Sequence, residues 1–503
     1  MSDVCGHASG DTLLEAIAGG RGDALVVPDD DARLGYEELV ATVAAVADRL
    51  RALGIARGDR VAFALPAGPE LVELLFAIAS LGAAAAPLNP AYAEPEFAFY
   101  LADLKPRLLV LPRGELAAAR QAAGTAVAIV DLVASPGRAP ELEGNARAGA
   151  ATAAPEAGDV ALLLHTSGTT SRPKQVPLSH TNLVASARSI ARHYALGEDD
   201  VSYCAMPLFH VHGVVASTLA PLVAGGTVVV PRRVAPGRFW PQLVKHGVTW
   251  YSASPTFHEM LLDRAPAELP AGTRLRFARS CSSAMRPVLA QRLETYLGVP
   301  LLEAYGMTEA SHEMAANPLP PRARVQGSVG LPTGAEIAIV DAAGDPLPPG
   351  QPGEVVIRGA GVMAGYLADA EVNEQAFFGE WFRTGDQGVL EDGYLRLVGR
   401  LKEIILRGGE NLSPLEVEEV LLGHPAVAEA VVYGIPDDRY GQVVGSAVVV
   451  REPGTEAGAL IEHCRERLAA FKVPRVVHLV ESIPRTPTGK VQRPRMAAHF
   501  GEE

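Results

Sequence analysis

Apolar positions in the first part of the chain follow two patterns, short continuous runs and a helical repeat. Between Gly35 and Leu53 the apolar residues recur every three or four positions, which predicts an amphipathic helix. The run RVAFALP at residues 60–66 predicts a short buried strand, and RLLVLP at 107–112 predicts another. Further helices are predicted over 69–81 and 94–104. Because strands alternate with helices, we expect parallel sheets layered with helices.

The pattern changes further along the chain. Residues 135–158 are rich in Ala, Gly, Pro and Glu and predict a loop or linker, after which a strand should end at His165. Between 330 and 400, short alternating apolar runs separated by Gly and Pro predict antiparallel strands. After Arg400, the order helix, strand, strand, helix predicts a compact unit. We therefore expect an α/β fold with a large multi-subdomain N-terminal domain at 1–400, in which parallel α/β layers are joined by a β-rich subdomain, and a small mobile α+β C-terminal domain at 401–503.

Composition narrows the class of protein. The chain has 503 residues, more than one core usually organises, and its 48% hydrophobic and 20% charged residues are typical of globular proteins. The net charge is −14 and no large Lys/Arg cluster occurs, so we do not expect nucleic-acid binding. The four widely spaced cysteines predict neither a zinc site nor a disulfide framework. We expect a cytoplasmic protein, because the longest apolar run (74–88) is too short to span a membrane and no signal peptide is apparent. Nothing in the pattern indicates the oligomeric state.

The segment HTSGTTSRPK, from His165 to Lys174, carries the strongest local chemical signal. A buried strand runs into a loop rich in hydroxyls and Gly that ends in Arg and Lys. Such a loop can offer backbone N–H groups, hydroxyls and one ammonium group to a chain of phosphates. The spacing differs from that of a P-loop, because no GK[ST] sequence occurs. On composition alone, an ordinary surface turn is equally compatible with the segment.

This segment resembles the phosphate-binding loop of the adenylate-forming superfamily, which includes acyl-CoA synthetases, peptide-synthetase adenylation domains and beetle luciferases. Five further motifs follow in the family's order: YGMTE (305–309), TGD (384–386), GRLKE (399–403), GGENLSPLE (408–416) and PRTPTGK (484–490). The chain is thereby identified as a member, similar to AMP-forming acyl-CoA synthetases. The resemblance implies an acid–CoA ligase that uses ATP, Mg²⁺ and coenzyme A and passes through an acyl-adenylate, the mixed anhydride of the acid with AMP.

The resemblance also implies roles for the motif residues in binding ATP and its adenylate. Tyr305 offers an aromatic face to adenine, Thr308 a hydroxyl to phosphate, and Glu309 a hard oxygen ligand to Mg²⁺. Asp386 can accept both ribose hydroxyls, with Arg400 beside the same nucleotide. The segment 280–285 occupies the place of the family's adenine wall. The remaining implied contacts are Thr166, Ser167, Gly168, Thr169, Thr170, Lys174, Ser283, Ala284 and Gly306.

The C-terminal motifs imply a moving part. Lys490 resembles the family's lysine that enters the site to orient the acid and ATP, which makes it a catalytic residue together with Thr308 and Glu309. Lys402 resembles the hinge about which the small domain turns between the two half-reactions. Gly408 and Gly409 would let the backbone approach the pantetheine arm of coenzyme A.

The acid is indicated only by neighbouring segments. PLFHVHG (207–213) resembles the family's substrate-pocket entry, with His210 as a gate and a candidate catalytic residue. The stretch 303–312 together with 317–320 looks most like oxalyl-CoA synthetases, which suggests a small dicarboxylate. His210 and His312 could hold the second carboxylate. Equally, both could be neutral wall residues. No Arg lies within these segments, although Arg279 and Arg286 flank one of them.

The phosphate loop departs from the family pattern at two glycines, which are replaced by Ser171 and Gln175. A non-Gly residue forced into a left-handed conformation costs on the order of 1–2 kcal/mol. Gln175 could also crowd the β- and γ-phosphates. A complete ligase and a ligase impaired in the ATP step, fed with acyl-adenylate by a separate adenylating partner enzyme, therefore both stay open. A third alternative, a ligase that loads a carrier protein instead of coenzyme A, lacks support because no carrier domain is apparent in the sequence. A non-catalytic scaffold is disfavoured because Glu309, Asp386, Lys402 and Lys490 are all present.

Overall fold

The computed structural model describes residues 11–134, 139–145, 153–166, 173–367, 370–407, 410–451, 454–485 and 491–500. By their internal contacts the residues form two compact units. Unit 1 comprises Met1–Ile337 with Ile357–Phe382, and unit 2 comprises Ala338–Val356 with Arg383–Glu503. The segment between Arg383 and Arg400 thus groups with the second unit, and the hinge expected after residue 400 stays a prediction. None of the described helices is long and apolar enough to cross a membrane.

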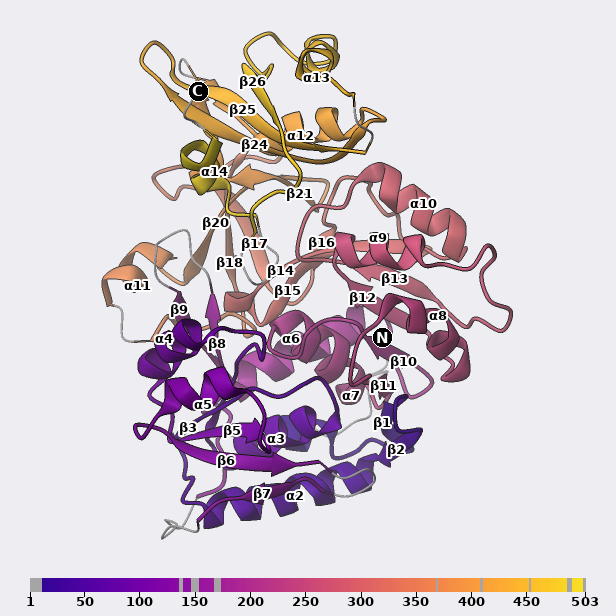
Figure 1. The fold of residues 1–503 in the computed structure, drawn as a ribbon, viewed down its shortest axis with the longest axis vertical. Helices are drawn as coiled ribbons and strands as arrows, with labels where there is room; N and C mark the ends of the chain where they lie inside the picture. The colour runs from indigo at the N-terminus through magenta and orange to yellow at the C-terminus, as the bar shows by residue number, and fades with distance from the viewer. Residues whose placement is uncertain are drawn as a thin grey trace. The chain divides into compact units, whose positions relative to one another are not determined.

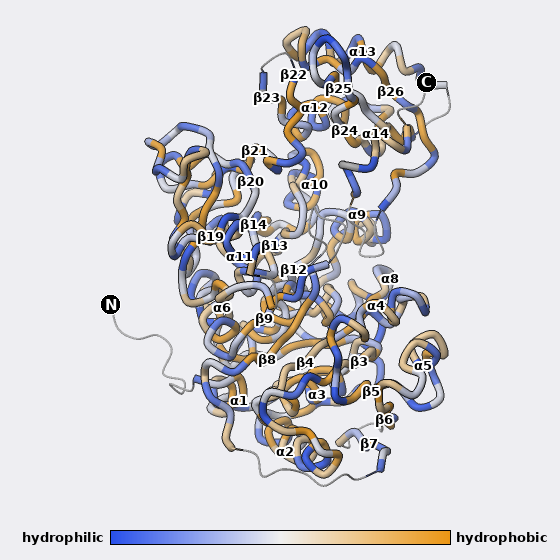
Figure 2. Tube along the Cα trace, turned by 90° about the vertical axis from the view of Figure 1, so that its left-hand side faces the viewer, coloured by the Kyte–Doolittle hydropathy of each residue, from blue (hydrophilic) through white to orange (hydrophobic). Residues whose placement is uncertain are grey.

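The first sheet of unit 1 has seven strands in the order β7-β6-β5-β3-β4-β8-β9. Its central strands are parallel, while β7 and β9 are antiparallel to their neighbours. The strands β3, β4 and β5 are largely hydrophobic along their length (Figure 2) because both of their faces are covered by helices. The bounds are β3 Arg60–Phe63, β4 Ala84–Pro87, β5 Leu108–Pro112, β6 Ala128–Val133, β7 Glu141–Glu143, β8 Val160–Thr166 and β9 Lys174–Ser179.

Two pairs of helices pack on this sheet (Figure 1): α2 (Tyr36–Ala52) with α3 (Pro69–Ser80), and α4 (Glu94–Leu104) with α5 (Ala117–Ala123). The predicted helices and strands of this region are confirmed to within a few residues. Helix α3 is buried almost all round, so its apolar side chains form a continuous run rather than a stripe. The short helix α1 (Leu13–Ile17) precedes the layer.

The second sheet of unit 1 has nine strands in the order β16-β15-β14-β13-β12-β10-β11-β1-β2. The strands from β14 to β1 are parallel, and antiparallel strands close both edges. The bounds are β1 Asp23–Val27, β2 Ala32–Gly35, β10 Val201–Cys204, β11 Thr227–Val229, β12 Trp250–Ala253, β13 Phe277–Ser280, β14 Leu301–Met307, β15 His312–Ala316 and β16 Leu331–Pro332.

Helices of this second layer begin at recognisable signals. Proline stands in the first turn of α8, α9 and α10, where its missing N–H costs nothing. Ser179 caps α6 through a hydrogen bond from Asn182 N. The bounds are α6 His180–His193, the π-helix η1 His212–Leu219, α7 Ala220–Val223, α8 Pro236–Lys245, α9 Pro255–Asp263, α10 Pro287–Leu297, the 3₁₀ helix η2 Thr308–Ala310 and α11 Ala370–Ala376.

The antiparallel strands predicted between 330 and 400 are confirmed as part of a five-stranded sheet. Its strands are β17 Glu336–Val340, β18 Gly353–Arg358, β19 Phe377–Phe378, β20 Trp381–Glu391 and β21 Tyr394–Arg400. The rest of unit 2 is a second five-stranded sheet covered by helices around a core that includes Val417, Val432 and Leu460. It comprises η3 Leu401–Glu403, β22 Ile405–Arg407, β23 Glu410–Leu412, α12 Pro414–Leu422, β24 Val427–Asp437, β25 Gly441–Val450, α13 Ala457–Arg465, β26 Val476–Leu479 and α14 Arg493–Phe500.

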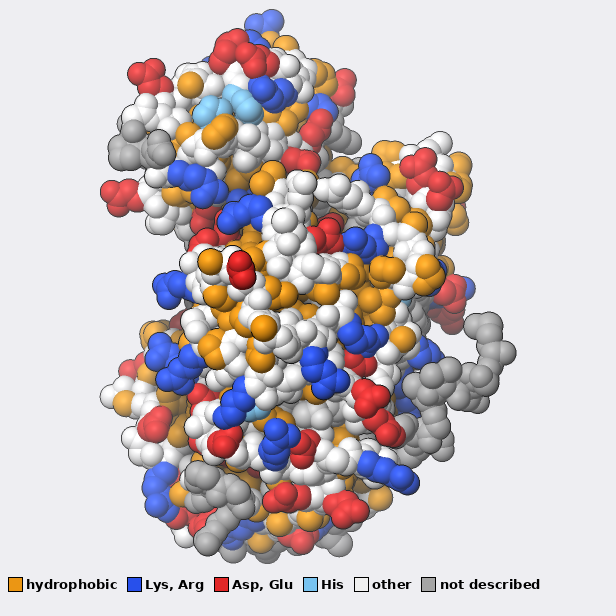
Figure 3. All heavy atoms as spheres, turned by 90° about the vertical axis from the view of Figure 1, so that its right-hand side faces the viewer, with side chains coloured by type: hydrophobic (Ala, Val, Ile, Leu, Met, Phe, Trp, Pro, Cys, Tyr) orange, Lys and Arg blue, Asp and Glu red, His pale blue; other side chains and the backbone are white. Residues whose placement is uncertain are grey.

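Charged side chains of both signs are interspersed over the face shown in Figure 3, and the basic ones do not gather into one continuous area there. This distribution suits a solvated surface whose opposite charges lie near one another.

Candidate active site

The hairpin of β8 and β9 brings together three of the predicted nucleotide contacts. Thr166 and Lys174 pair across the hairpin, next to the loop that joins the two strands. Thr166 Oγ1 donates to Glu309 Oε1 over 3.4 Å, and the Tyr366 hydroxyl donates to the same oxygen over 2.8 Å. Lys174 Nζ lies 4.7 Å from the centre of the Tyr366 ring. Tyr366 thus joins the lysine to the carboxylate, and sequence reasoning missed it.

Tyr366 is positioned by its own segment of backbone. Met363 N donates to the carbonyl of Glu309 over 2.8 Å, and Leu367 N donates to the carbonyl of Gln175 over 3.2 Å. These two bonds hold the segment against η2 at one end and β9 at the other. Within the motifs, no residue spacing indicates this arrangement.

Strands β13 and β14 run parallel side by side, so the residues after their carboxyl ends share one edge of the sheet. Ser283 and Ala284 follow β13 and are exposed, and Thr308 follows β14. Tyr305 is buried in β14, immediately before a bulge in the pairing of β14 with β15. A Cβ atom at Gly306 would lie 2.0 Å from the carbonyl oxygen of His312, so only glycine fits there.

A second group of buried polar side chains surrounds Arg279, at the carboxyl end of β13. The side chains of Arg279 and Glu313 are 0% exposed and form an ion pair of 2.7 Å. Arg279 also donates to Tyr194 Oη (3.0 Å), Ser252 Oγ (2.7 Å) and His312 Nε2 (2.9 Å). We call Arg279, Glu313, His212, His312 and Ser252, which are buried, together with the exposed Ser282, the Arg279 cluster.

The direction of each hydrogen bond in the Arg279 cluster follows from the arginine, which can only donate. Arg279 Nη1 also lies 3.4 Å from His212 Nε2, which makes that nitrogen an acceptor. Ser252 accepts from Arg279 and donates its own proton to the same His212 Nε2, 2.6 Å away. His212 Nδ1 then carries a proton and donates to Ser282 Oγ over 2.9 Å. His312 Nε2 accepts from Arg279, which leaves the proton of that ring on Nδ1. Two donors remain for a ligand, the Ser282 hydroxyl and His312 Nδ1–H.

Both imidazoles of the Arg279 cluster are neutral. Burial lowers the pKa of His212 and the pKa of His312 well below the ordinary histidine value, and the neighbouring Arg279 charge lowers them further. The two rings stack with their centroids 4.9 Å apart. The donors at the end of the network are therefore uncharged, and the charge of Arg279 is compensated by Glu313.

The cluster contains His312, one of the two histidines predicted to hold a second carboxylate, but its other imidazole is His212 rather than His210. The carboxylate-binding role of His312 stays a prediction. His210 lies before η1, half-buried, with its ring 4.9 Å from that of Phe209. The backbone folds back closely here: a Cβ at Gly213 would lie only 2.2 Å from the carbonyl oxygen of Pro207, so the position requires glycine. The gating role of His210 stays a prediction.

In unit 2, Asp386 and Arg400 lie together. They pair across β20 and β21, and Arg400 Nε lies 3.0 Å from Asp386 Oδ1. Asp386 is buried within β20, and its backbone N–H donates to Thr384 Oγ1 over 3.1 Å. Lys402 lies exposed in η3.

Several predicted site residues lie outside the described part of the chain. They are Ser167, Gly168, Thr169, Thr170, Gly408, Gly409 and Lys490, together with the substituted Ser171.

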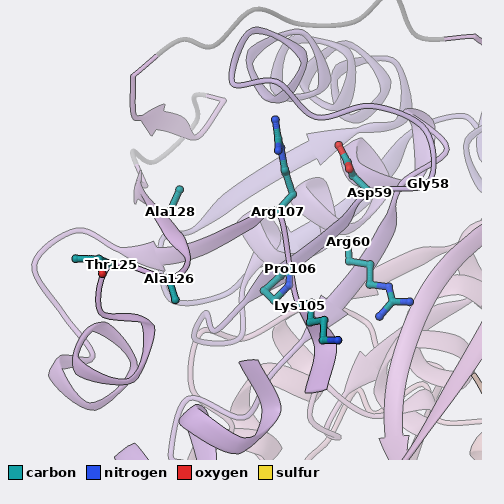
Figure 4. A pocket seen from close by; sticks show the side chains of 9 residues that line it. All are labelled: Gly58, Asp59, Arg60, Lys105, Pro106, Arg107, Thr125, Ala126 and Ala128. Carbon is teal, nitrogen blue, oxygen red and sulfur yellow. The ribbon is translucent and has the colours of Figure 1, made fainter. Parts of the chain in front are cut away.

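A cavity of about 490 Å³ lies elsewhere in unit 1, at the amino ends of β3, β5 and β6. Arg60, Lys105 and Arg107 line it, but their side chains point in different directions (Figure 4) and do not converge on one ligand. Arg60 is also engaged by the carbonyl of Leu104, at 3.0 Å. Parallel sheets bind ligands at their carboxyl ends, where the hairpin and the Arg279 cluster lie.

Comparison with known proteins agrees with this geometry. The AMP-binding enzyme family matches residues 14–367, and the AMP-binding enzyme C-terminal domain matches 416–490. An oxalate–CoA ligase of Arabidopsis thaliana is 44% identical over 90% of each chain, and a sulfoacetate–CoA ligase of Cupriavidus necator is 37% identical over 94% of each. The o-succinylbenzoate CoA synthetase of Bacillus subtilis, solved with its acyl-adenylate intermediate, superposes with a TM-score of 0.84 at 29% identity, over 96% of this chain and 97% of that one. The chain therefore belongs to the AMP-binding enzyme family of acyl-CoA synthetases, and it is an acid–CoA ligase that joins a carboxylic acid to coenzyme A through an acyl-adenylate.

Proposed function

We propose that the acid is a short dianion, of which oxalate is the simplest, and that Ser282 and His312 bind its second anionic group. The observation that carries this proposal is the directed hydrogen-bond chain of the Arg279 cluster, which ends in two donors. A ligand group that receives both donors must offer acceptor lone pairs, and a carboxylate or sulfonate offers several of them with no donor of its own.

The charge balance of the Arg279 cluster supports a dianion that binds there through its second anionic group, while its first carboxylate reacts with ATP. Because Glu313 neutralises Arg279, the ligand meets polarised neutral donors rather than a free cation. Ser282 and His312 also hold backbone φ angles of +79° and +105°. Such strain in non-glycine residues tends to persist at functional sites, where the surrounding structure imposes it.

Two relatives support the same class of substrate. The oxalate–CoA ligase and the sulfoacetate–CoA ligase are named for acids with two carbon atoms and a second anionic group. A single feature, a short acid with a second anion, accounts for both names, and the Arg279 cluster offers a receptor for that feature.

The nucleotide side of the site is proposed to work with Mg²⁺. Glu309 would bind the ion through Oε2, because Thr166 and Tyr366 both donate to Oε1. Among the described residues, no group of three or more His, Cys, Asp or Glu side chains could hold a metal ion, so the phosphates and water would supply the other ligands. Thr166 and Lys174 would contact the phosphates, Tyr305 the adenine, and Asp386 with Arg400 the ribose.

A panel of acids tests the proposal. Oxalate, malonate, sulfoacetate, glycolate and acetate are each supplied with ATP, Mg²⁺ and coenzyme A, and thioester formation is measured. We expect kcat/KM for the best two-carbon dianion to exceed that for acetate by at least about 100-fold, the range that unpaired polar groups in a site can impose. A preference for acetate, or for long monocarboxylates, contradicts the proposal.

A variant links the preference to the cluster. Ser282→Ala removes one donor and should raise KM for the dianion by about 10-fold while the KM for ATP stays unchanged. Ser80→Ala, on α3 outside the cluster, is the matched control and should leave both constants unchanged. If the KM for the dianion is unaltered in Ser282→Ala, residues other than Ser282 bind the second anionic group of the dianion.

A further inference from the structure

The face of the β8–β9 hairpin opposite Lys174 carries a separate group of hydrogen bonds. The side-chain amide of Gln175 donates to Asp103 Oδ2 over 2.6 Å and to the carbonyl oxygen of Asp103 over 2.9 Å. Its oxygen accepts from Arg60 at 3.4 Å. Both amide protons and the amide oxygen of Gln175 are therefore engaged, which fixes the side chain.

His165 binds the same carboxylate from the other strand. Its Nε2 lies 2.8 Å from Asp103 Oδ2, and its side chain is only 7% exposed. Tyr100, one turn earlier on α4, packs edge-on against the imidazole at 4.8 Å. Burial lowers the pKa of His165 although the Asp103 carboxylate opposes this effect, so the neutral ring donates through Nε2–H.

The register of the hairpin connects this group to the nucleotide contacts. His165 pairs with Gln175, and the next pair is Thr166 with Lys174. Successive side chains of a strand point to opposite faces. Asp103 therefore ties the two strands together on one face, one residue before the pair that meets Glu309 and Tyr366 on the other. The name hairpin clamp is used below for Asp103, His165 and Gln175.

We infer that the hairpin clamp is a positioning device for the ATP half-reaction, which sets the place of Thr166 and Lys174 relative to Glu309. The inference rests on the proposed roles of these residues at the phosphates and magnesium. The clamp residues themselves have no proposed contact with the nucleotide. Each acts through the strand that carries its neighbour.

This inference reverses the expectation that Gln175 crowds the phosphates. The residue lies in β9 as ordinary extended strand, where any side chain is accommodated, so the backbone does not require glycine. Its side chain points away from Lys174 and toward α4. Crowding predicts that Gln175→Gly speeds adenylation, whereas the clamp predicts that it slows adenylation.

The experiment compares the two half-reactions in Gln175→Gly and Asp103→Ala. Adenylation is measured by ATP–pyrophosphate exchange with the best acid of the panel, and thioester formation is measured from synthetic acyl-adenylate and coenzyme A. We expect each variant to lower kcat/KM for ATP in the exchange by about 10- to 100-fold, the effect of a small misplacement of reacting groups. The rate from supplied adenylate should stay within about twofold of wild type.

Two further variants separate positioning from general damage. Asp103→Asn keeps one oxygen that can accept from both partners, so it should restore at least half of the exchange that Asp103→Ala loses. Lys105→Ala, at the exposed residue that follows the end of α4, is the matched control and should exchange at the wild-type rate. Faster or unchanged exchange in Gln175→Gly overturns the inference. Equal losses in both half-reactions also overturn it, because they indicate a merely structural role. Failure of the wild type to use any short dianion would instead count against the proposed substrate and leave the comparison of half-reactions valid with another acid.

Discussion

The Tyr366 hydroxyl donates to Glu309 Oε1 over 2.8 Å, and the Lys174 ammonium lies over the same tyrosine ring. The tyrosine thereby orients the carboxylate proposed to bind Mg²⁺ and also places the lysine proposed to meet the phosphates. A hydrogen bond to a charged group contributes about 1.5–3 kcal/mol, which corresponds to a rate factor of about 10- to 100-fold.

Tyr366→Phe removes this hydroxyl and keeps the ring. We expect pyrophosphate exchange to fall by about 10-fold at limiting Mg²⁺ and to recover in part at high Mg²⁺, because the misoriented Glu309 binds the ion more weakly. The measurement is exchange as a function of Mg²⁺ concentration. Tyr296→Phe, whose hydroxyl contacts only backbone carbonyls on the surface, is the control. A Mg²⁺ dependence identical to wild type would separate Tyr366 from the metal.

Lys490→Ala should abolish adenylation and spare the thioester step. The resemblance of PRTPTGK to the family's C-terminal motif places Lys490 in only one of the two half-reactions. The measurement is pyrophosphate exchange beside thioester formation from supplied acyl-adenylate. A comparable loss of activity in both assays would contradict a role of Lys490 that is specific to adenylation.

Arg279→Leu should destabilise the protein by about 3–5 kcal/mol, because it leaves the Glu313 carboxylate buried without its partner. Urea denaturation followed by tryptophan fluorescence reports this change, since Trp250 lies in the same core and stacks on Phe277. The control is Arg465→Leu, which breaks the exposed pair with Glu462 and should cost less than about 1 kcal/mol. Equal effects in the two variants would contradict the assignment of the buried pair.

Glu73→Gln should stabilise the protein in a pH-dependent way. Burial, and next the neighbouring Glu70, raises the pKa of Glu73 to about 8 in the folded state, against 4.5 as its ordinary value. Between those values the folded state holds a proton that the unfolded state releases, so stability falls as pH rises from 4.5 to 8. A glutamine at this position does not ionise, so the variant does not lose stability over this pH range.

The variant should therefore gain about 3 kcal/mol over wild type at pH 7 and nothing at pH 4. Urea midpoints of both proteins at the two pH values provide the measurement. Glu37→Gln, at an exposed position of α2, should show no such difference. A gain that does not depend on pH would mean that Glu73 is ionised in the folded protein.

The sequence predicted the layers of the fold because burial and periodicity are local properties. Helix α2 carries an apolar stripe and β3 a short apolar run, and neither depends on distant residues for its type. Asp386 and Arg400 were also predictable as a pair of neighbours, since their motifs are specific. The contact of Tyr366 with Glu309 was not predictable, because it depends on two backbone hydrogen bonds that join segments with no fixed spacing.

The histidines show a second limit. A pattern of 3.6 residues per turn does not decide whether His210 or His212 points toward His312, because the helix that follows is a π-helix with a different phase. Gln175 was different, since strand alternation alone sends its side chain to the face opposite Lys174. The replacement of a glycine shows only that a side chain is added, whereas the strand decides to which face that side chain points.

The Arg279–Glu313 pair has a consequence for how such an enzyme can change its substrate. An acid with an uncharged tail would not need the polarised donors. Replacing only Arg279 or only Glu313, however, leaves the opposite charge buried without a partner. A change of one residue alone therefore destabilises the protein by about 3–5 kcal/mol, and only a paired change avoids that cost. Selection or engineering toward apolar acids would therefore meet a barrier at this pair, whereas exchange of one small anion for another could proceed by single substitutions around it.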